Sequence, residues 1–135
     1  MGKFAVHKYG CHMYQKKIPV SLYCGLHYFK EILNGKWKLM LIHYISEGFM
    51  RPSELQRAIP KADRRVMNRQ LEELVLHGFI TKKIYDGKLS KVEYKLTALG
   101  ENLLPLIYEI ERWGQENQLV IEKAMKNDPK FEHVV

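Results

Sequence analysis

The chain has 135 residues with 22 basic and 15 acidic side chains, which give a formal net charge of +7 at pH 7. This length accommodates one domain and excludes separate catalytic and cofactor-binding domains. Hydrophobic residues make up 46% of the chain and charged residues 27%, which excludes intrinsic disorder and fibrous repeats. No apolar run approaches the roughly 18 residues that span a bilayer, and the N-terminus contains no apolar block, so we expect a cytoplasmic protein.

The positive charge is unevenly distributed along the chain. Residues 1–50 contain seven Lys and two Glu, and residues 51–91 contain ten basic and five acidic side chains. Residues 98–135, in contrast, contain four basic and seven acidic side chains. Such an uneven field is typical of a surface that binds a polyanion, although it also fits a soluble protein that binds none.

Apolar periodicity predicts three short helices in the first half of the chain. The first begins near Leu22 and ends before Gly35, a helix-ending residue. The second covers residues 36–47 and ends at Gly48, which supplies a left-handed backbone conformation. The third covers residues 52–59, with a proline in its first turn and another immediately after its end.

The fourth predicted helix begins after Asp63, a favourable N-cap, and has two contrasting faces. Its apolar stripe consists of Met67, Leu71, Leu74 and Val75. A rotation of about 100° per residue places a polar group on the other side. This group consists of Arg64, Arg65, Asn68 and Arg69. Arg65, Asn68 and Arg69 are candidates for contact with base edges, and Arg64 equally for contact with a phosphate. The alternative is a solvated exterior without a ligand.

A β-hairpin is predicted after this helix, because residues 79–85 and 91–96 alternate apolar and polar side chains around Asp86-Gly87. Four lysines are candidates for phosphate contacts from this hairpin. They are Lys82, Lys83, Lys88 and Lys91.

A long helix is predicted after Thr97, its N-cap. One apolar line runs along it and is expected to continue through Val120 and Ile121, with a bend at Pro105. An apolar line far from a small core needs a covering partner, and a second copy of the chain is the simplest one. The candidate dimer-interface residues are Leu103, Ile107, Ile110 and Trp113.

The predicted fold is mainly α with a small β-hairpin wing, a winged helix-turn-helix. In such a fold, the helix predicted after Asp63 fits the major groove, which is about 12 Å wide, while the hairpin reaches the DNA backbone. We divide the chain into an N-terminal extension over residues 1–21, the winged helix-turn-helix domain with its C-terminal dimerisation helix over residues 22–126, and a tail over residues 127–135.

Four sequence blocks resemble the HxlR-type winged helix-turn-helix transcriptional regulators, which are related in fold to the MarR group. The resemblance covers residues 24–117. The blocks are Asn34-Gly35-Lys36-Trp37-Lys38-Leu39, Arg51-Pro52-Ser53-Glu54-Leu55-Gln56-Arg57-Ala58-Ile59-Pro60, Leu71-Glu72-Glu73-Leu74 with Gly78-Phe79-Ile80, and Val92-Glu93-Tyr94-Lys95-Leu96-Thr97 with Leu99-Gly100.

This resemblance implies a homodimeric regulator that binds pseudo-palindromic double-stranded DNA, with repression favoured over activation. It places the helix that starts after Asp63 in the major groove, makes the hairpin the wing, and assigns the dimer interface to the terminal helices. A small-molecule or oxidant effector is compatible with it.

The two cysteines, Cys11 and Cys24, are too few for a disulfide scaffold or a four-cysteine metal site. Members of the resembled family usually have Cys-Pro at the position of Cys24, which Gly25 follows here. In some of them this cysteine senses oxidants, so Cys24 is a candidate redox sensor. The alternative is a small buried hydrophobic residue.

A zinc site could be imagined from the two cysteines with His7, His12 and His27, but the spacing is poor for one. We therefore expect no metal and no cofactor. Catalytic motifs for phosphate binding, acyl transfer and metalloproteolysis are missing from the sequence, so we expect no enzyme. A protein-binding adaptor without DNA binding and, less favoured, a thiol-redox enzyme based on Cys24 are the alternatives.

Overall fold

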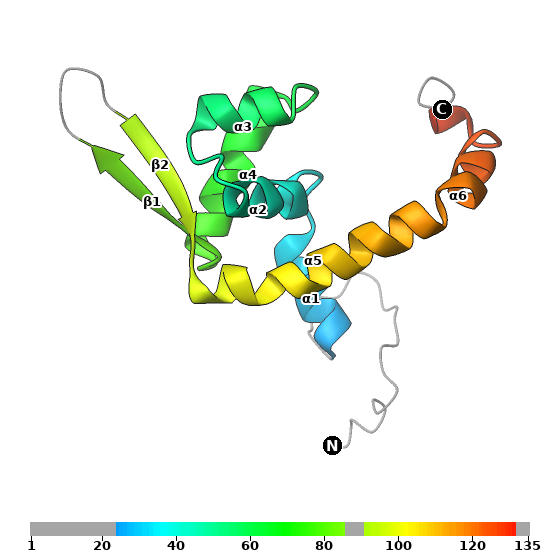
Figure 1. Ribbon diagram of the computed structural model, residues 1–135, viewed down its shortest axis with the longest axis horizontal. Helices are drawn as coiled ribbons and strands as arrows, with labels where there is room; N and C mark the ends of the chain where they lie inside the picture. Colours follow the sequence, from blue (N-terminus) through cyan, green and yellow to red (C-terminus); the bar gives the residue numbers. More distant parts are fainter. Residues whose placement is uncertain (1–23, 86–90, 132–135) are drawn as a thin grey trace, which may run out of the picture.

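The computed structural model describes residues 24–85 and 91–131. The elements are α1 (Gly25–Leu33), α2 (Lys38–Ser46), α3 (Pro52–Ala58), α4 (Arg64–Leu76), β1 (Ile80–Tyr85), β2 (Lys91–Leu96), α5 (Ala98–Glu116), α6 (Gln118–Met125) and a 3-10 turn (Pro129–Phe131). Helices α2, α3 and α4 gather beside the hairpin, whereas α5 extends away and holds α6 far from it (Figure 1). The predicted fold, mainly helical with a two-stranded wing, is confirmed.

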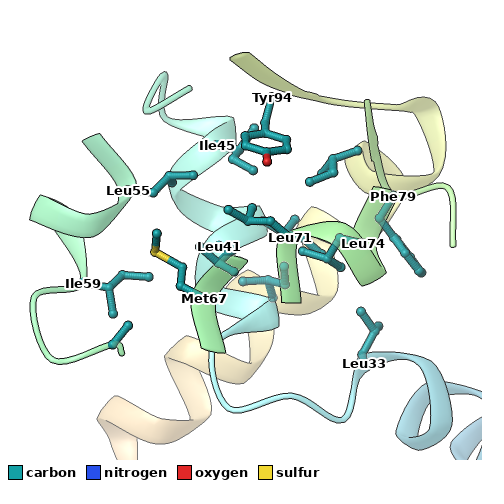
Figure 2. Close-up of a cluster of buried hydrophobic side chains, with 14 residues drawn as sticks. Leu33, Leu41, Ile45, Leu55, Ile59, Met67, Leu71, Leu74, Phe79 and Tyr94 are labelled. Carbon is teal, nitrogen blue, oxygen red and sulfur yellow. The ribbon is translucent and has the colours of Figure 1, made fainter. Parts of the chain in front are cut away.

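The core lies between α2, α3, α4 and the base of the hairpin (Figure 2). Met67, Leu71 and Leu74, three members of the predicted apolar stripe of α4, are each 0% exposed. They pack with Leu41 of α2 and Leu55 of α3 in one buried cluster. Burial of this stripe fixes which face of α4 points outward.

Helices α3 and α4 begin at well-formed caps. The Asp63 side chain accepts hydrogen bonds from the backbone N–H groups of Arg65 at 2.9 Å and Val66 at 3.2 Å. Glu54 accepts from the backbone N–H groups of Arg51 and Met50, and these bonds lower the pKa of its carboxyl group. Each cap satisfies amides that a helix start leaves without partners, and so defines the first residues of its helix.

Strands β1 and β2 pair antiparallel from Ile80 opposite Leu96 to Tyr85 opposite Lys91. The backbone N–H of Tyr94 donates to the carbonyl of Met50 at 2.9 Å, which joins β2 to the connection between α2 and α3. The predicted reversal at Asp86-Gly87 lies outside the described residues.

Three details of the predicted helices differ or fall outside the description. Asn117 ends α5, where its side-chain nitrogen donates to the carbonyl of Trp113 at 2.9 Å, so the C-terminal apolar line is divided between α5 and α6. Helix α5 runs on through Pro105. The described part of α1 begins after Cys24, and Leu22 lies outside it. None of the helices in the described ranges is long and apolar enough to cross a bilayer.

Candidate nucleic-acid interface

The four polar residues predicted on the outer side of α4 are all exposed, opposite the buried stripe. We call this surface, Arg64, Arg65, Asn68 and Arg69, the α4 outer face. The Asp63 cap and the buried stripe together hold its backbone in place. Guanidinium and amide groups on one exposed helix face present hydrogen-bond donors in a plane that matches base edges and phosphates.

Arg69 has one acidic neighbour on its own helix. Its Nε lies 4.0 Å from Oε2 of Glu73, and its side chain is 62% exposed. An exposed pair of this kind is worth about 1 kcal/mol or less, and it engages only Nε, so the rest of the guanidinium stays accessible to DNA.

The hairpin lysines do not share one face. The strand register pairs Lys82 with Tyr94 and Lys83 with Glu93, and side chains of consecutive residues project to opposite faces. Lys82 lies 2.8 Å from Oε2 of Glu72 on α4, and this hydrogen bond raises its pKa. Lys83 lies over the ring of Tyr85 at 4.8 Å, on the other face. Lys88 lies outside the described residues.

A basic hollow of about 320 Å³ joins α4 to the hairpin. Its lining residues are Arg51, Pro52, Ser53, Arg64, Lys91 and Val92. Three cations therefore surround a space open to solvent, which suits an anion such as a phosphate. Arg64 and Lys91 were predicted as DNA contacts and meet here. Arg51 was not predicted, although its place immediately before Pro52, at the start of a helix, is a signal that could have indicated it.

Arg51 is held beside the hairpin by an acidic residue. Its Nη2 lies 3.7 Å from Oε2 of Glu93, whose side chain is 15% exposed. Tyr85 donates a hydrogen bond to the other oxygen of Glu93 at 3.0 Å. These contacts connect the start of α3 with the wing.

The predicted dimer residues fall into two groups. Ile107 is 8% exposed and belongs to the core of its own chain, and Leu103 packs against that core. Ile110 and Trp113 are 42% and 60% exposed. Val120, which was predicted to continue the apolar line, is 70% exposed. Further exposed apolar side chains on the same and neighbouring helices were not predicted, because periodicity does not show which line a core covers. These are Leu26, Tyr28, Leu106 and Leu119.

Cys24 is the N-cap residue of α1 and is half-buried. It is disulfide-bonded in the structure. Cys11, His7 and His12 lie outside the described residues, so the structure does not describe the imagined zinc site as a whole.

A second hollow, of about 440 Å³, lies between α2, β2 and the start of α5. Its lining residues are Ile45, Ser46, Met50, Tyr94, Lys95, Leu96, Glu101 and Leu104. Its volume lies in the range of small-molecule sites, and its lining is partly apolar and partly charged. A small-molecule effector stays a prediction, and this hollow is the place to look for it.

The chain is similar to known proteins in sequence and in fold. The model of the HxlR-like helix-turn-helix family matches residues 32–122. The chain is 38% identical over 91 residues to YkvN, an HTH-type transcriptional regulator of Bacillus subtilis, and the match covers 67% of this chain and 77% of YkvN.

Solved structures show the same fold. The redox regulator HypR in its reduced form superposes with a TM-score of 0.69 at 31% identity, over 74% of this chain and 99% of HypR. A transcriptional regulator of the MarR family from Porphyromonas gingivalis superposes with a TM-score of 0.68 at 39% identity, over 76% of this chain and 99% of that protein.

Proposed function

Because the chain belongs to the HxlR-like helix-turn-helix family, we propose that it binds duplex DNA as a homodimer, with α4 in the major groove of each half-site. Its relatives are transcriptional regulators, and the chain is a DNA-binding regulator of transcription and not an enzyme. In this proposal, the surface that contacts DNA extends from the α4 outer face across the basic hollow to the wing.

The observation that supports this proposal most strongly is the exposure of Arg65, Asn68 and Arg69 on one face of a helix whose other face is buried. A helix held in this way presents its donors as a rigid group, so little conformational freedom is lost on binding. Arg and Asn side chains form bidentate pairs with guanine and adenine. These three residues therefore contact bases in our proposal.

Phosphate contacts come from the cations around the basic hollow. Arg51, Arg64 and Lys91 line it together with the hydroxyl-bearing Ser53. A backbone phosphate in this hollow would fix the distance between α4 and the wing without specifying sequence. Lys83 extends the same contact along the hairpin, and Lys82 would have to leave Glu72 to take part. Lys88, outside the described residues, stays a predicted phosphate contact.

The homodimer is supported by the apolar side chains that α5 and α6 leave uncovered. Trp113, Leu119 and Val120 are 60%, 81% and 70% exposed. A two-fold partner would remove these side chains from water and would cover the same residues of both copies. Two copies would place two α4 helices on half-sites about one helical turn apart, or a multiple of it. Repression then follows if the bound dimer occupies a promoter.

Selection of bound duplexes from a random pool tests the whole proposal. We expect a pseudo-palindromic consensus whose half-sites are separated by about 10 base pairs or a multiple. A consensus without two-fold symmetry would refute the homodimer, and the absence of any enriched duplex at low salt would favour the protein-binding adaptor.

Control by oxidants is a second proposal. It is supported by the disulfide at Cys24 and by the similarity to HypR, which is a redox regulator. The thiol and disulfide states of Cys24 would then have different affinities for DNA. DNA release by a mild thiol oxidant should differ between the wild type and Cys24→Ser. Identical release would show that Cys24 is not the sensor.

A further inference from the structure

Two polar side chains are buried among the described residues, and neither belongs to the DNA-contacting surface proposed above. Lys38 at the start of α2 and Gln70 in the middle of α4 are each 4% exposed. Burial of an ammonium group is strongly unfavourable unless the charge is paired and hydrogen-bonded. Lys38 must therefore have partners that stabilise its buried charge.

Lys38 connects the segment before α2 to α4. Its Nζ donates to the carbonyl of Ile32 at 2.9 Å and lies 2.9 Å from Oε1 of Glu73. Gln70 makes a parallel connection one turn earlier, where its Oε1 accepts from the backbone N–H of Trp37 at 2.9 Å. The start of α2 is thus attached to α4 at two places along the helix, and Lys38 also joins it to the last turn of α1.

Glu73 has a different neighbour at each of its two oxygens. Oε1 pairs with the buried Lys38, and Oε2 lies 4.0 Å from Nε of Arg69 on the α4 outer face. The Lys38 side chain is 5% exposed, whereas those of Glu73 and Arg69 are 41% and 62% exposed. The carboxylate therefore bridges a buried charge and an exposed charge.

The hydrogen bond from Lys38 lowers the pKa of Glu73. The same hydrogen bond favours the ionised carboxylate, whose other oxygen is the acceptor that faces the guanidinium of Arg69. A surface carboxylate without such an anchor samples several rotamers and orients a neighbouring arginine poorly.

We propose that Lys38 positions Arg69 for base contact by fixing the carboxylate of Glu73 at the edge of the α4 outer face. The inference rests on the proposed function, because it takes Arg69 as a residue that contacts bases. Lys38 touches no DNA in this arrangement and is a positioning residue. An arginine restricted in advance to one orientation loses less freedom when it forms a bidentate pair, so the effect belongs to sequence preference more than to general affinity.

The test compares Lys38→Met and Glu73→Gln with the wild type on the duplex consensus that the wild-type chain selects from a random pool. Each base pair of this duplex is also changed in turn. We expect both variants to lose about three- to tenfold of preference at the base pair that Arg69→Ala relaxes, because an imperfect bidentate pair discriminates less. Preference at the other base pairs should be retained.

Glu72→Gln is the matched control. Glu72 precedes Glu73 on α4, and its substitution removes the same charge, but its partner is Lys82 at 2.8 Å and not Arg69. This variant should change affinity for all duplexes alike and leave the base-pair profile unchanged. In an Arg69→Ala background, Lys38→Met should cause no further loss of preference, because the residue through which it acts is gone.

A melting temperature measured for each variant separates positioning from stability. If Lys38→Met and Glu73→Gln lower the melting temperature but keep the wild-type base-pair profile, the inference is overturned. Should Lys38→Met fail to fold, Glu73→Gln decides the matter, since its half-exposed site tolerates an amide. A wild type that binds no duplex overturns the proposed function and this inference with it, whereas wild-type binding with an unchanged variant profile overturns the inference alone.

Discussion

Two regions of the molecule differ in how far their apolar side chains are exposed to solvent. In the head, which comprises α1 to α4, the hairpin and the first half of α5, the core residues are 0–8% exposed. In the arm, residues 108–125, Ile110 is 42%, Trp113 60% and Leu119 81% exposed. The head and the arm also differ in charge, because residues 51–91 of the head contain ten basic and five acidic side chains and residues 108–125 contain two and four.

The difference separates a region that is stabilised by packing within one chain from a region whose apolar side chains need a second copy to cover them. The head contains a cluster of apolar side chains that are buried within the chain, and such burial is the dominant favourable contribution to folding. The arm continues α5 beyond Ile107, and the α5 side chains that pack with the core, Leu103, Leu104 and Ile107, all precede it. Its apolar side chains gain this contribution only when another surface covers them. Substitutions in the two regions should therefore have effects of different kinds.

The largest effect is expected in the head. Leu71→Ala removes a fully buried side chain of α4 and should lower the free energy of unfolding by about 2–5 kcal/mol, because it leaves a cavity in the core. Urea denaturation followed by circular dichroism measures the change. Leu76→Ala, in the same helix but 78% exposed, should change it by only about 0.5 kcal/mol. Equal losses for the two variants would contradict the assignment of the head core.

A substitution in the arm should act on association. Trp113→Glu places a charge in the apolar surface proposed for the dimer and should weaken association by about 2–4 kcal/mol, which is roughly 30- to 1000-fold. Sedimentation velocity over a range of concentrations measures it. Gln115→Glu, an exposed position of the same helix outside the apolar line, should leave the dimer intact. A wild type that stays monomeric at every concentration would refute the proposed dimer interface of the arm.

On the DNA-binding side of the head, Arg69→Ala should cost about 1–3 kcal/mol on the preferred duplex and relax one base position. Titrations with the preferred and a random duplex measure the loss. The same charge change in the arm, Lys123→Ala, should have little effect on either. If Arg69→Ala weakens both duplexes equally, Arg69 contacts a phosphate.

The basic hollow should contribute affinity without sequence preference. Arg51→Ala removes one of its three cations and should weaken binding to every duplex, with a decrease of about 1 in the salt slope. Affinity measured over several salt concentrations gives this slope. If it does not change, no phosphate lies beside Arg51.

The smallest effect concerns the cap of α3. Its hydrogen bonds hold the pKa of Glu54 below the usual 4.5, so the carboxylate is favoured in the folded state. The stabilisation is present above pH 4.5 and is lost as the pH falls through the lower folded value. Glu54→Gln should therefore flatten the acid side of the stability profile slightly, as thermal melts between pH 3 and pH 6 would show, with Glu101→Gln as the exposed control. If the melting temperature of the variant falls with acid as steeply as that of the wild type, Glu54 does not contribute to the pH dependence of stability.

The sequence predicted the order of the elements, the Asp63 and Thr97 caps and the outward face of α4. The structure agrees with each of these predictions. These features depend on residues close together in the chain, where periodicity and capping preferences act directly. The break at Asn117 and the core position of Ile107 were not predicted. The core position of Ile107 depends on packing with residues remote in the sequence, which no local pattern shows.

The same distinction applies to the candidate site. Its arginines were recognisable because helical geometry alone brings Arg65 and Arg69 to one face. The basic hollow unites Arg51, Arg64 and Lys91 from three elements, and their meeting is set by the packing of the hairpin against the helices.

Local patterns in the chain thus established the helices, the hairpin and the basic face of α4, since side chains three or four residues apart in a helix, or two apart in a strand, share a face whatever surrounds them. Only the packed structure decided that Lys38 is buried against Glu73, that Arg51 lies beside the wing and that the arm stays uncovered. Those outcomes depend on distances between residues remote in sequence, which folding sets by burying apolar surface and pairing the charges it encloses.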